Sequence, residues 1–138
     1  MSEDWALLYD AECGFCRVCV AVLLVKDRRH RMRPVALQDP RAVALLPGRD
    51  ESARMASWHV VAPDGRVWSA GAALAPALRL LPGGGFAAGF AERFPGAVDR
   101  VYWFAVRHRG QLGKLIPGRV KTWASARITS SSSGVSEP

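Results

Sequence analysis

The feature that most constrains the fold of this chain is the cysteine pair Cys13 and Cys16, which lies between two apolar segments. Residues 5–9 form a short apolar and aromatic run that stops at Asp10, as a buried strand would. Residues 14–26 are rich in valine and leucine, exceed the length of an ordinary strand and end in a lysine, so they predict a helix. The two cysteines therefore stand at the junction of a strand and a helix.

The middle of the chain predicts a second strand, a hairpin and further helices. Residues 32–37 predict a strand that Pro34 confines to its start or to the edge of a sheet. Residues 57–61 and 66–69 flank residues 63–65, Pro-Asp-Gly, which suit a tight turn, and so they predict a β-hairpin. Helices are expected at three further places: residues 40–46, residues 72–81 with a kink or a true start at Pro76, and an amphipathic segment over residues 98–105.

This order of elements predicts an α/β fold with a thioredoxin-like core, in which a β-α-β unit is followed by a β-hairpin and a helix. Further helices would be added at the C-terminal side of this core. Phe86, Phe90 and Phe94 are four residues apart, and they predict a helix face that packs into the core. We expect a domain over residues 1–112, and a basic and then Ser-rich tail over residues 113–138 that is flexible and dispensable for folding.

Composition excludes several classes of protein. A chain of 138 residues has the length of one domain, and its 49% apolar and 22% charged residues exclude a disordered protein. The longest apolar run, residues 18–25, is shorter than the roughly 20 residues of a membrane-spanning helix. The first residues are acidic where a secretory signal is basic and then apolar, so we expect a cytoplasmic protein.

The charge of the chain bears on its partners. A net charge of +7 leaves nucleic acids, anionic lipids and acidic partners open. The basic residues concentrate in residues 26–33 and 100–138. The first of these segments spans a helix end and a loop, where basic residues are common, and no nucleic-acid-binding motif accompanies it. We expect no specific nucleic-acid partner, and at most weak contact with an anionic surface.

The spacing of the cysteines suits redox chemistry. Positions three apart are neighbours on a helix, so both sulfur atoms can meet across its first turn. The unpaired N–H groups and the dipole at a helix N-terminus favour a thiolate, and such placement can lower a cysteine pKa from about 8.5 to about 3.5–7.5. Cys13 is therefore the expected nucleophile, and Cys16, further into the helix, is the expected resolving thiol.

Asp10 admits two interpretations. A carboxylate near a thiolate raises the pKa of that thiol and so opposes the effect of the helix terminus. Asp10 could accept the proton of Cys16 during resolution, directly or through water. It could equally be a plain cap of the following helix.

The run Tyr-Asp-x-x-Cys-Gly-Phe-Cys at residues 9–16 resembles the DCC family of predicted thiol-disulfide oxidoreductases, named for the Asp, Cys and Cys that are Asp10, Cys13 and Cys16 here. The likeness continues in five further segments: residues 37–38, 57–61, 64–67, 71–82 and 101–109. The resemblance implies a small thioredoxin-like protein and a reaction type, thiol-disulfide exchange, but no particular substrate. We expect a protein or low-molecular-weight thiol or disulfide as substrate, and no cofactor or metal. Phe15, Ser57 and His59 are the residues expected to contact the substrate.

Three features depart from the related patterns. Residues 11–12 are Ala-Glu, where the family more often has Gly-Asp. Residues 55–58 contain no proline, although thioredoxin-fold enzymes usually place a cis-proline before this strand. Cys19 is an additional thiol one turn beyond Cys16.

Some residues fit more than one role. Cys19 suits either a small buried hydrophobe or a third thiol that passes the disulfide on. His59 could stabilise the thiolate or could be a half-exposed strand histidine without a role. The three cysteines with His30 or His59 could form a Cys₃His zinc site, although structural zinc usually draws pairs of ligands from separate loops. A zinc- or soft-metal-binding protein and a non-catalytic binding module therefore stay as alternatives to the enzyme.

Overall fold

Four short strands form one mixed sheet in the computed structural model, which describes residues 4–133. The strands are β1 (Trp5–Tyr9), β2 (Met32–Ala36), β3 (His59–Val61) and β4 (Val67–Ser69). Their order in the sheet is β2-β1-β3-β4. β1 pairs in parallel with β2 and antiparallel with β3, and β3 pairs antiparallel with β4.

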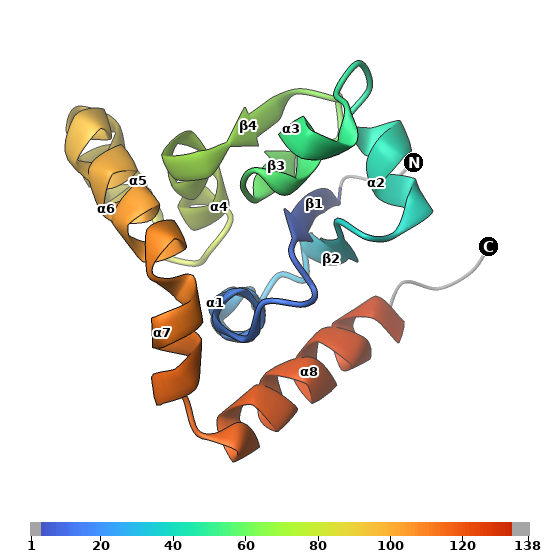
Figure 1. Cartoon of the computed structure of the whole chain (residues 1–138). Coiled ribbons are helices and arrows are strands. Elements are labelled where there is room, and N and C mark those ends of the chain that lie inside the picture. The colour runs from blue at the N-terminus through green and yellow to red at the C-terminus, as the bar shows by residue number, and fades with distance from the viewer. Residues whose placement is uncertain (1–3, 134–138) are drawn as a thin grey trace.

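Helices surround this sheet (Figure 1). They are α1 (Gly14–Lys26), α2 (Pro40–Leu45), α3 (Glu51–Met55), the 3₁₀ turn η1 (Ala70–Ala73), α4 (Leu74–Arg79), α5 (Gly85–Arg93), α6 (Pro95–Arg107), α7 (Arg109–Leu115) and α8 (Gly118–Ser133). The sequence did not predict α3. Pro76 lies in the first turn of α4, where the backbone N–H that proline lacks has no helical partner anyway. No helix within residues 4–133 combines the length and the hydropathy needed to cross a membrane.

The expected thioredoxin-like core is confirmed. β1 and β2 are parallel and are joined through α1, and Pro34 lies on β2, which is the edge strand. β3 and β4 form the expected hairpin. Its turn needs Gly65, whose φ of +95° strains any residue with a side chain and whose N–H donates to the Ala62 carbonyl at 2.9 Å. The helices from α5 onward are the C-terminal addition to this core.

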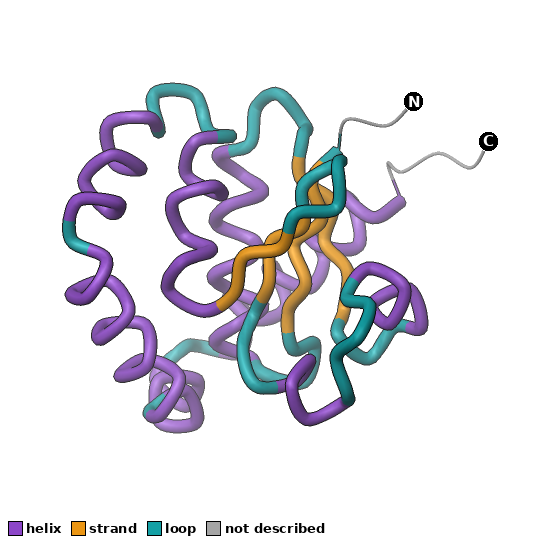
Figure 2. The backbone as a smooth tube through the Cα atoms, turned by 90° about the horizontal axis from the view of Figure 1, so that it is seen from above, coloured by secondary structure: helices purple, strands orange, loops and turns teal. Residues whose placement is uncertain are grey.

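The core is divided between the two faces of the sheet. Neighbouring residues of a strand point to opposite faces, and both Leu7 and Leu8 of β1 are fully buried. Leu7 packs on the side that α1, α4 and α8 cover, whereas Leu8 packs on the side of α2. Helices lie on both sides of the sheet (Figure 2). Burial of each of these leucines stabilises the fold by about 1.5–3 kcal/mol. The face under α1 is the one that positions the cysteines.

The prediction of a flexible tail is wrong for residues 118–133, which form α8 and pack along α1. Ala124 is fully buried, Ile128 is 6% exposed, and Arg127 donates from Nη2 to the Leu24 carbonyl at 3.3 Å. Within residues 118–130, Ala124 and Ile128 are the buried apolar side chains of α8, and they lie one helical turn apart, so the apolar pattern is too sparse to stand out among Ser and Arg. Residues 134–138 of the expected tail lie outside the described residues, and the domain boundary at residue 112 stays a prediction.

The expected aromatic core face is also wrong. Phe86, Phe90 and Phe94 are 88%, 62% and 44% exposed. The helix α5 instead turns Ala88 and Ala91 towards α4, where they form a small buried cluster. Small side chains allow two helix backbones to approach closely, and the opposite face with the phenylalanines is left at the surface.

Candidate active site

Cys13 occupies the N-cap position of α1. Its backbone is extended, with φ −97° and ψ 112°, and its Sγ accepts a hydrogen bond from the Cys16 backbone N–H at 3.2 Å. The Cys13 carbonyl accepts the Arg17 N–H at 3.0 Å, which closes the first helical turn. The side chain of Cys13 therefore satisfies one of the N–H groups that have no partner at a helix start.

This position makes Cys13 acidic. The pKa of Cys13 is lowered from 9.0 to about 6, chiefly because the Cys16 side chain hydrogen-bonds to its sulfur. Burial opposes this change, while the backbone hydrogen bond from Cys16 and the positive charge of Arg109 add to it. At neutral pH, Cys13 is mostly a thiolate, which is the reactive form of cysteine.

Cys16 has the opposite character. Its pKa is raised far above the ordinary value, first because its thiol is the partner of Cys13, and then because of burial and the negative charge of Cys13. The pair therefore shares one proton, which stays on Cys16. This asymmetry matches the expected order of a first attack by Cys13 and a later attack by Cys16.

Asp10 is held at the end of β1 by three other residues. Its Oδ1 accepts the Glu12 backbone N–H and the Gln38 side-chain amide, both at 2.9 Å. Its Oδ2 forms an ion pair with Arg109 at 3.4 Å. Gln38 also accepts the Ala11 N–H at 3.1 Å, so one glutamine side chain fixes both the carboxylate and the backbone before the cysteines.

Asp10 is not the cap of α1, because Cys13 occupies that position, so this interpretation of Asp10 is wrong. The carboxylate instead organises the turn between β1 and α1. Its negative charge raises the pKa of both Cys13 and Cys16, and the positive charge of Arg109 lowers both. The ion pair thus sets two opposing charges beside the dithiol.

Two basic residues near the dithiol were not predicted as site residues. Arg109 begins α7 and forms the ion pair with Asp10. Lys121 of α8 lies against Gly14: a Cβ on this glycine would be 3.1 Å from Cε and 3.2 Å from Cδ of the lysine. Gly14 therefore leaves room for the side chain of Lys121. Arg109 lies within the family likeness of residues 101–109, which assigned it no role, and nothing local in the sequence marks Lys121.

Phe15 and Ser57 lie near the dithiol, and their role as substrate contacts stays a prediction. Phe15 is half-buried in the first turn of α1, and a Cβ on Gly113 of α7 would be 3.8 Å from its backbone nitrogen. Ser57 precedes Trp58, whose backbone N–H donates to Tyr102 Oη at 3.1 Å. Burial raises the pKa of Tyr102, and the charge of the Cys16 sulfur adds to this, which places the phenol close to the dithiol.

The peptide bond before β3 also differs from the usual thioredoxin-fold arrangement. No cis peptide bond occurs within residues 4–133. The backbone N–H of Trp58, just before β3, is already bonded to Tyr102, a residue that the sequence did not single out. The strand entrance beside the dithiol is therefore closed by a side chain of α6.

His59 is not brought to the cysteines. It pairs with Leu8 across β1 and β3, so it lies on the face of the sheet away from α1. The residue is 1% exposed, its Nε2 donates to the Arg54 carbonyl at 2.9 Å, and its Nδ1 accepts from Ser69 Oγ at 2.6 Å in the tautomer that these bonds require. Burial lowers the pKa of His59, so it is neutral. It holds the loop before β3 in place.

Cys19 and His30 lie at the surface. The expectation that Cys19 is buried is therefore wrong for the residue as a whole. Partial burial of its thiol and the negative charge of Cys13 raise the pKa of Cys19 to about 11, so this thiol stays protonated at neutral pH. Within residues 4–133, no group of three or more His, Cys, Asp or Glu side chains is arranged to hold a metal ion.

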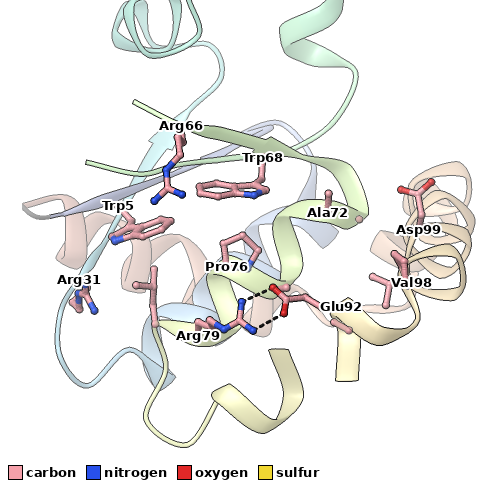
Figure 3. Close-up of a pocket in the computed structure, with 15 residues that line it drawn as sticks. Trp5, Arg31, Arg66, Trp68, Ala72, Pro76, Arg79, Glu92, Val98 and Asp99 are labelled. Atoms are coloured by element: carbon pink, nitrogen blue, oxygen red, sulfur yellow. Dashed lines mark hydrogen bonds and ion pairs between the residues drawn. The ribbon is translucent and has the colours of Figure 1, made fainter. Parts of the chain in front are cut away.

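A cavity of about 670 Å³ lies away from the dithiol (Figure 3). Trp5 and Trp68 stack at its edge with ring centroids 5.7 Å apart, and the ion pair of Arg79 with Glu92 joins α4 to α5 across it. Trp5 begins β1, whereas the cysteines follow the end of that strand. The dithiol is therefore outside this cavity.

The comparison with known families agrees with this geometry. The chain matches the family described as DCC1-like thiol-disulfide oxidoreductase over residues 7–115. No curated protein and no solved structure matches the chain significantly. The matched range contains Asp10, both cysteines of the motif, and Arg109, and it ends with α7, before α8. The resemblance found in the motif is thus confirmed, and the chain belongs to the DCC1-like thiol-disulfide oxidoreductase family.

Proposed function

We propose that the protein exchanges disulfides with Cys13 as the nucleophile and Cys16 as the resolving thiol. The observation that carries this proposal is the hydrogen bonding between the two residues. Both the backbone N–H and the side chain of Cys16 bond to the sulfur of Cys13, with a pKa of about 6 for Cys13 as the result. One thiolate and one protonated thiol are then present together at neutral pH.

The reaction proceeds in two displacements. The thiolate of Cys13 attacks one sulfur of a substrate disulfide, forms a mixed disulfide and releases the first substrate thiolate. Cys16 then loses its proton and attacks the sulfur of Cys13, which releases the second substrate thiolate and leaves a Cys13–Cys16 disulfide. Two electrons pass from the protein dithiol to the substrate, and the reverse sequence oxidises a substrate dithiol.

Asp10 is the proposed acceptor of the Cys16 proton, directly or through one water. The mixed disulfide removes the negative charge of Cys13, which is one of the causes that hold the pKa of Cys16 high. A carboxylate whose charge acts on Cys16 can then take the proton as the second attack begins. The bonds from Gln38 and Glu12 keep this carboxylate in place.

The substrate is a protein disulfide or a low-molecular-weight disulfide, and no cofactor takes part. Phe15 and Ser57 lie beside the dithiol and are the proposed substrate contacts. A cytoplasmic location, where thiols are kept reduced, suits a protein that supplies electrons in this way.

Variants of the cysteines test the proposal with hydroxyethyl disulfide as substrate and dithiothreitol as reductant. Cys13→Ser should abolish turnover, and Cys16→Ser should accumulate a mixed disulfide that mass measurement detects. Cys19→Ser is the matched control and should keep its turnover. Full turnover by Cys13→Ser would contradict the proposal, as would purified protein that carries stoichiometric zinc on its cysteines and resists oxidation.

A further inference from the structure

An ammonium group without an acidic partner lies beside the nucleophile. The Nζ of Lys121 would be 3.5 Å from a Cβ on Gly14, the residue that follows Cys13. Lys121 is half-buried, and no carboxylate forms an ion pair with it within residues 4–133. Arg109, which also lies near the site, is already paired with Asp10.

The remaining charges near the site do not satisfy this lysine. Arg109 lowers and Asp10 raises the pKa of Cys13, and these two residues form an ion pair with each other. Glu12 is the other acidic residue nearby, and it is exposed and forms no ion pair in the described chain. The ammonium of Lys121 is therefore available to an anion that approaches the dithiol.

We propose that Lys121 provides an anion subsite and that the protein prefers low-molecular-weight disulfides that carry a carboxylate near the disulfide bond. This inference rests on the proposed function, because the subsite is useful only if Cys13 attacks a disulfide. A lysine ammonium is a compact charge with three donors, which suits a carboxylate. Attraction between opposite charges raises the rate of encounter and weakens as salt is added.

The elements around the dithiol favour a small substrate. The helix α8 places Lys121 against Gly14, and α7 places Gly113 beside the backbone of Phe15. Two helices thus flank the turn from Cys13 to Cys16, and we expect them to hinder the docking of a folded protein more than the approach of a small disulfide. The carboxylate would lie at Lys121 while the substrate sulfur meets Cys13.

The test uses single turnovers of the reduced full chain with three alkyl disulfides of different charge. Dithiodipropionate carries carboxylates, hydroxyethyl disulfide is neutral and cystamine carries ammonium groups. Each consumes the dithiol by yielding two thiols and one protein disulfide, so no further reductant is needed. The loss of protein thiols over time is measured by quenching samples with an alkylating reagent. Each rate is divided by the rate at which mercaptoethanol reacts with the same disulfide, which corrects for the intrinsic reactivity of that disulfide.

The variant Lys121→Met keeps the length of the side chain and removes its charge, and Lys26→Met makes the same change at the far, exposed end of α1. We expect the rate ratio of dithiodipropionate to cystamine to fall by about three-fold or more in Lys121→Met, the scale of an exposed charge pair. Lys26→Met should keep the wild-type ratio. Lys121→Arg should retain most of the preference, because it retains the charge.

Equal ratios of the dithiodipropionate rate to the cystamine rate in the wild type and in Lys121→Met would overturn the inference. An equal fall of this ratio in Lys26→Met would also overturn it, because the preference would then depend on the net charge of the protein and not on Lys121. If Lys121→Met does not fold, the wild-type ratio still tests the inference, because it should fall as sodium chloride is raised to about 0.5 M. An unchanged ratio would overturn the inference. Failure of hydroxyethyl disulfide to oxidise the wild-type dithiol would instead contradict the proposed function.

Discussion

Removal of one side chain of α8 tests whether this helix is part of the fold. Ile128 is 6% exposed and packs in the same core cluster as Leu24 of α1 and Met32 of β2. A change of a buried isoleucine to alanine costs about 2–5 kcal/mol, from lost burial and from the cavity that remains. Since α8 lies on the outside of α1 and can partly close this cavity, we expect Ile128→Ala to lose about 2–3 kcal/mol.

This loss is a large part of the roughly 5–15 kcal/mol that stabilises a domain. A loss of 1 kcal/mol lowers the melting temperature of a domain of this size by about 3–6 °C, so Ile128→Ala should melt about 6–18 °C below the wild type. The assay is thermal and urea unfolding of the reduced chain, monitored by circular dichroism. Thr129→Ala is the control, because Thr129 is the exposed neighbour on the same helix and should melt within about 2 °C of the wild type.

A melting temperature of Ile128→Ala within about 2 °C of the wild type would refute the packing of α8. In that case, residues 118–133 would be as dispensable as the sequence predicts. A large fall in the melting temperature of both variants would also count against the argument. It would indicate that any substitution in α8 destabilises the protein, and not specifically the loss of the buried Ile128 side chain.

Three further predictions follow from the site and the fold. Asp10→Asn should lower the pKa of Cys13 below about 6, because the carboxylate raises it, and should slow decay of the mixed disulfide; the pH profile of alkylation and mass measurement check these effects. The pKa of His59 is lowered from 6.5 by burial, so the unfolded state binds the proton more readily and the free energy of unfolding should decrease as pH falls below 6.5; urea titrations at several pH values, with the His59 resonance followed by NMR, check this. Gly71→Ala should destabilise the protein, because a Cβ there would be 2.7 Å from a backbone carbon of α6, whereas Gly89→Ala should raise the melting temperature, because nothing lies within 4 Å of a Cβ there and alanine favours a helix.

The parts of the fold that the sequence predicted are those with strong local signals. The apolar run of β1 has the length of a strand, whereas the apolar segment of α1 is too long for one and so predicts a helix. The proline of β2 predicts an edge strand, and the order of the sheet confirms this position. The β3–β4 hairpin followed from its turn residues, and Gly65 indeed has a positive φ. Each of these signals lies within the element that it predicts.

The errors came from elements whose packing depends on distant partners. The phenylalanines of α5 have the spacing of a core face, but α4 packs against the alanines of that helix and the aromatic side is exposed. The helix α8 has few apolar residues, and their burial depends on the shape of α1. Residue spacing gives the period of a helix face, whereas the partner decides which face is buried.

The same distinction applies to the active site. Asp10, Cys13 and Cys16 lie close together in the sequence, so the motif was sufficient to find them. Gln38, just after β2, donates to Asp10, and Arg109 of α7 forms an ion pair with it. The family likeness included both residues, but nothing in the sequence showed that they contact Asp10. The sequence allowed His59 to lie near the thiolate, but its side chain points to the other face of the sheet. Side chains alternate between the two faces along a strand, and the sequence alone did not fix the register that decides the face of His59.

These long-range contacts couple the stability of the C-terminal helices to the chemistry of the motif. Ile128 anchors α8 in the core, and two turns earlier the same helix places Lys121 against Gly14. A change that loosens α8 without unfolding the rest should therefore weaken the preference for carboxylate disulfides. It should leave the pKa of Cys13 near 6, because that value depends chiefly on the bonds from Cys16. The motif would then determine the reactivity of the thiolate, while α8 would determine which disulfides reach it fastest.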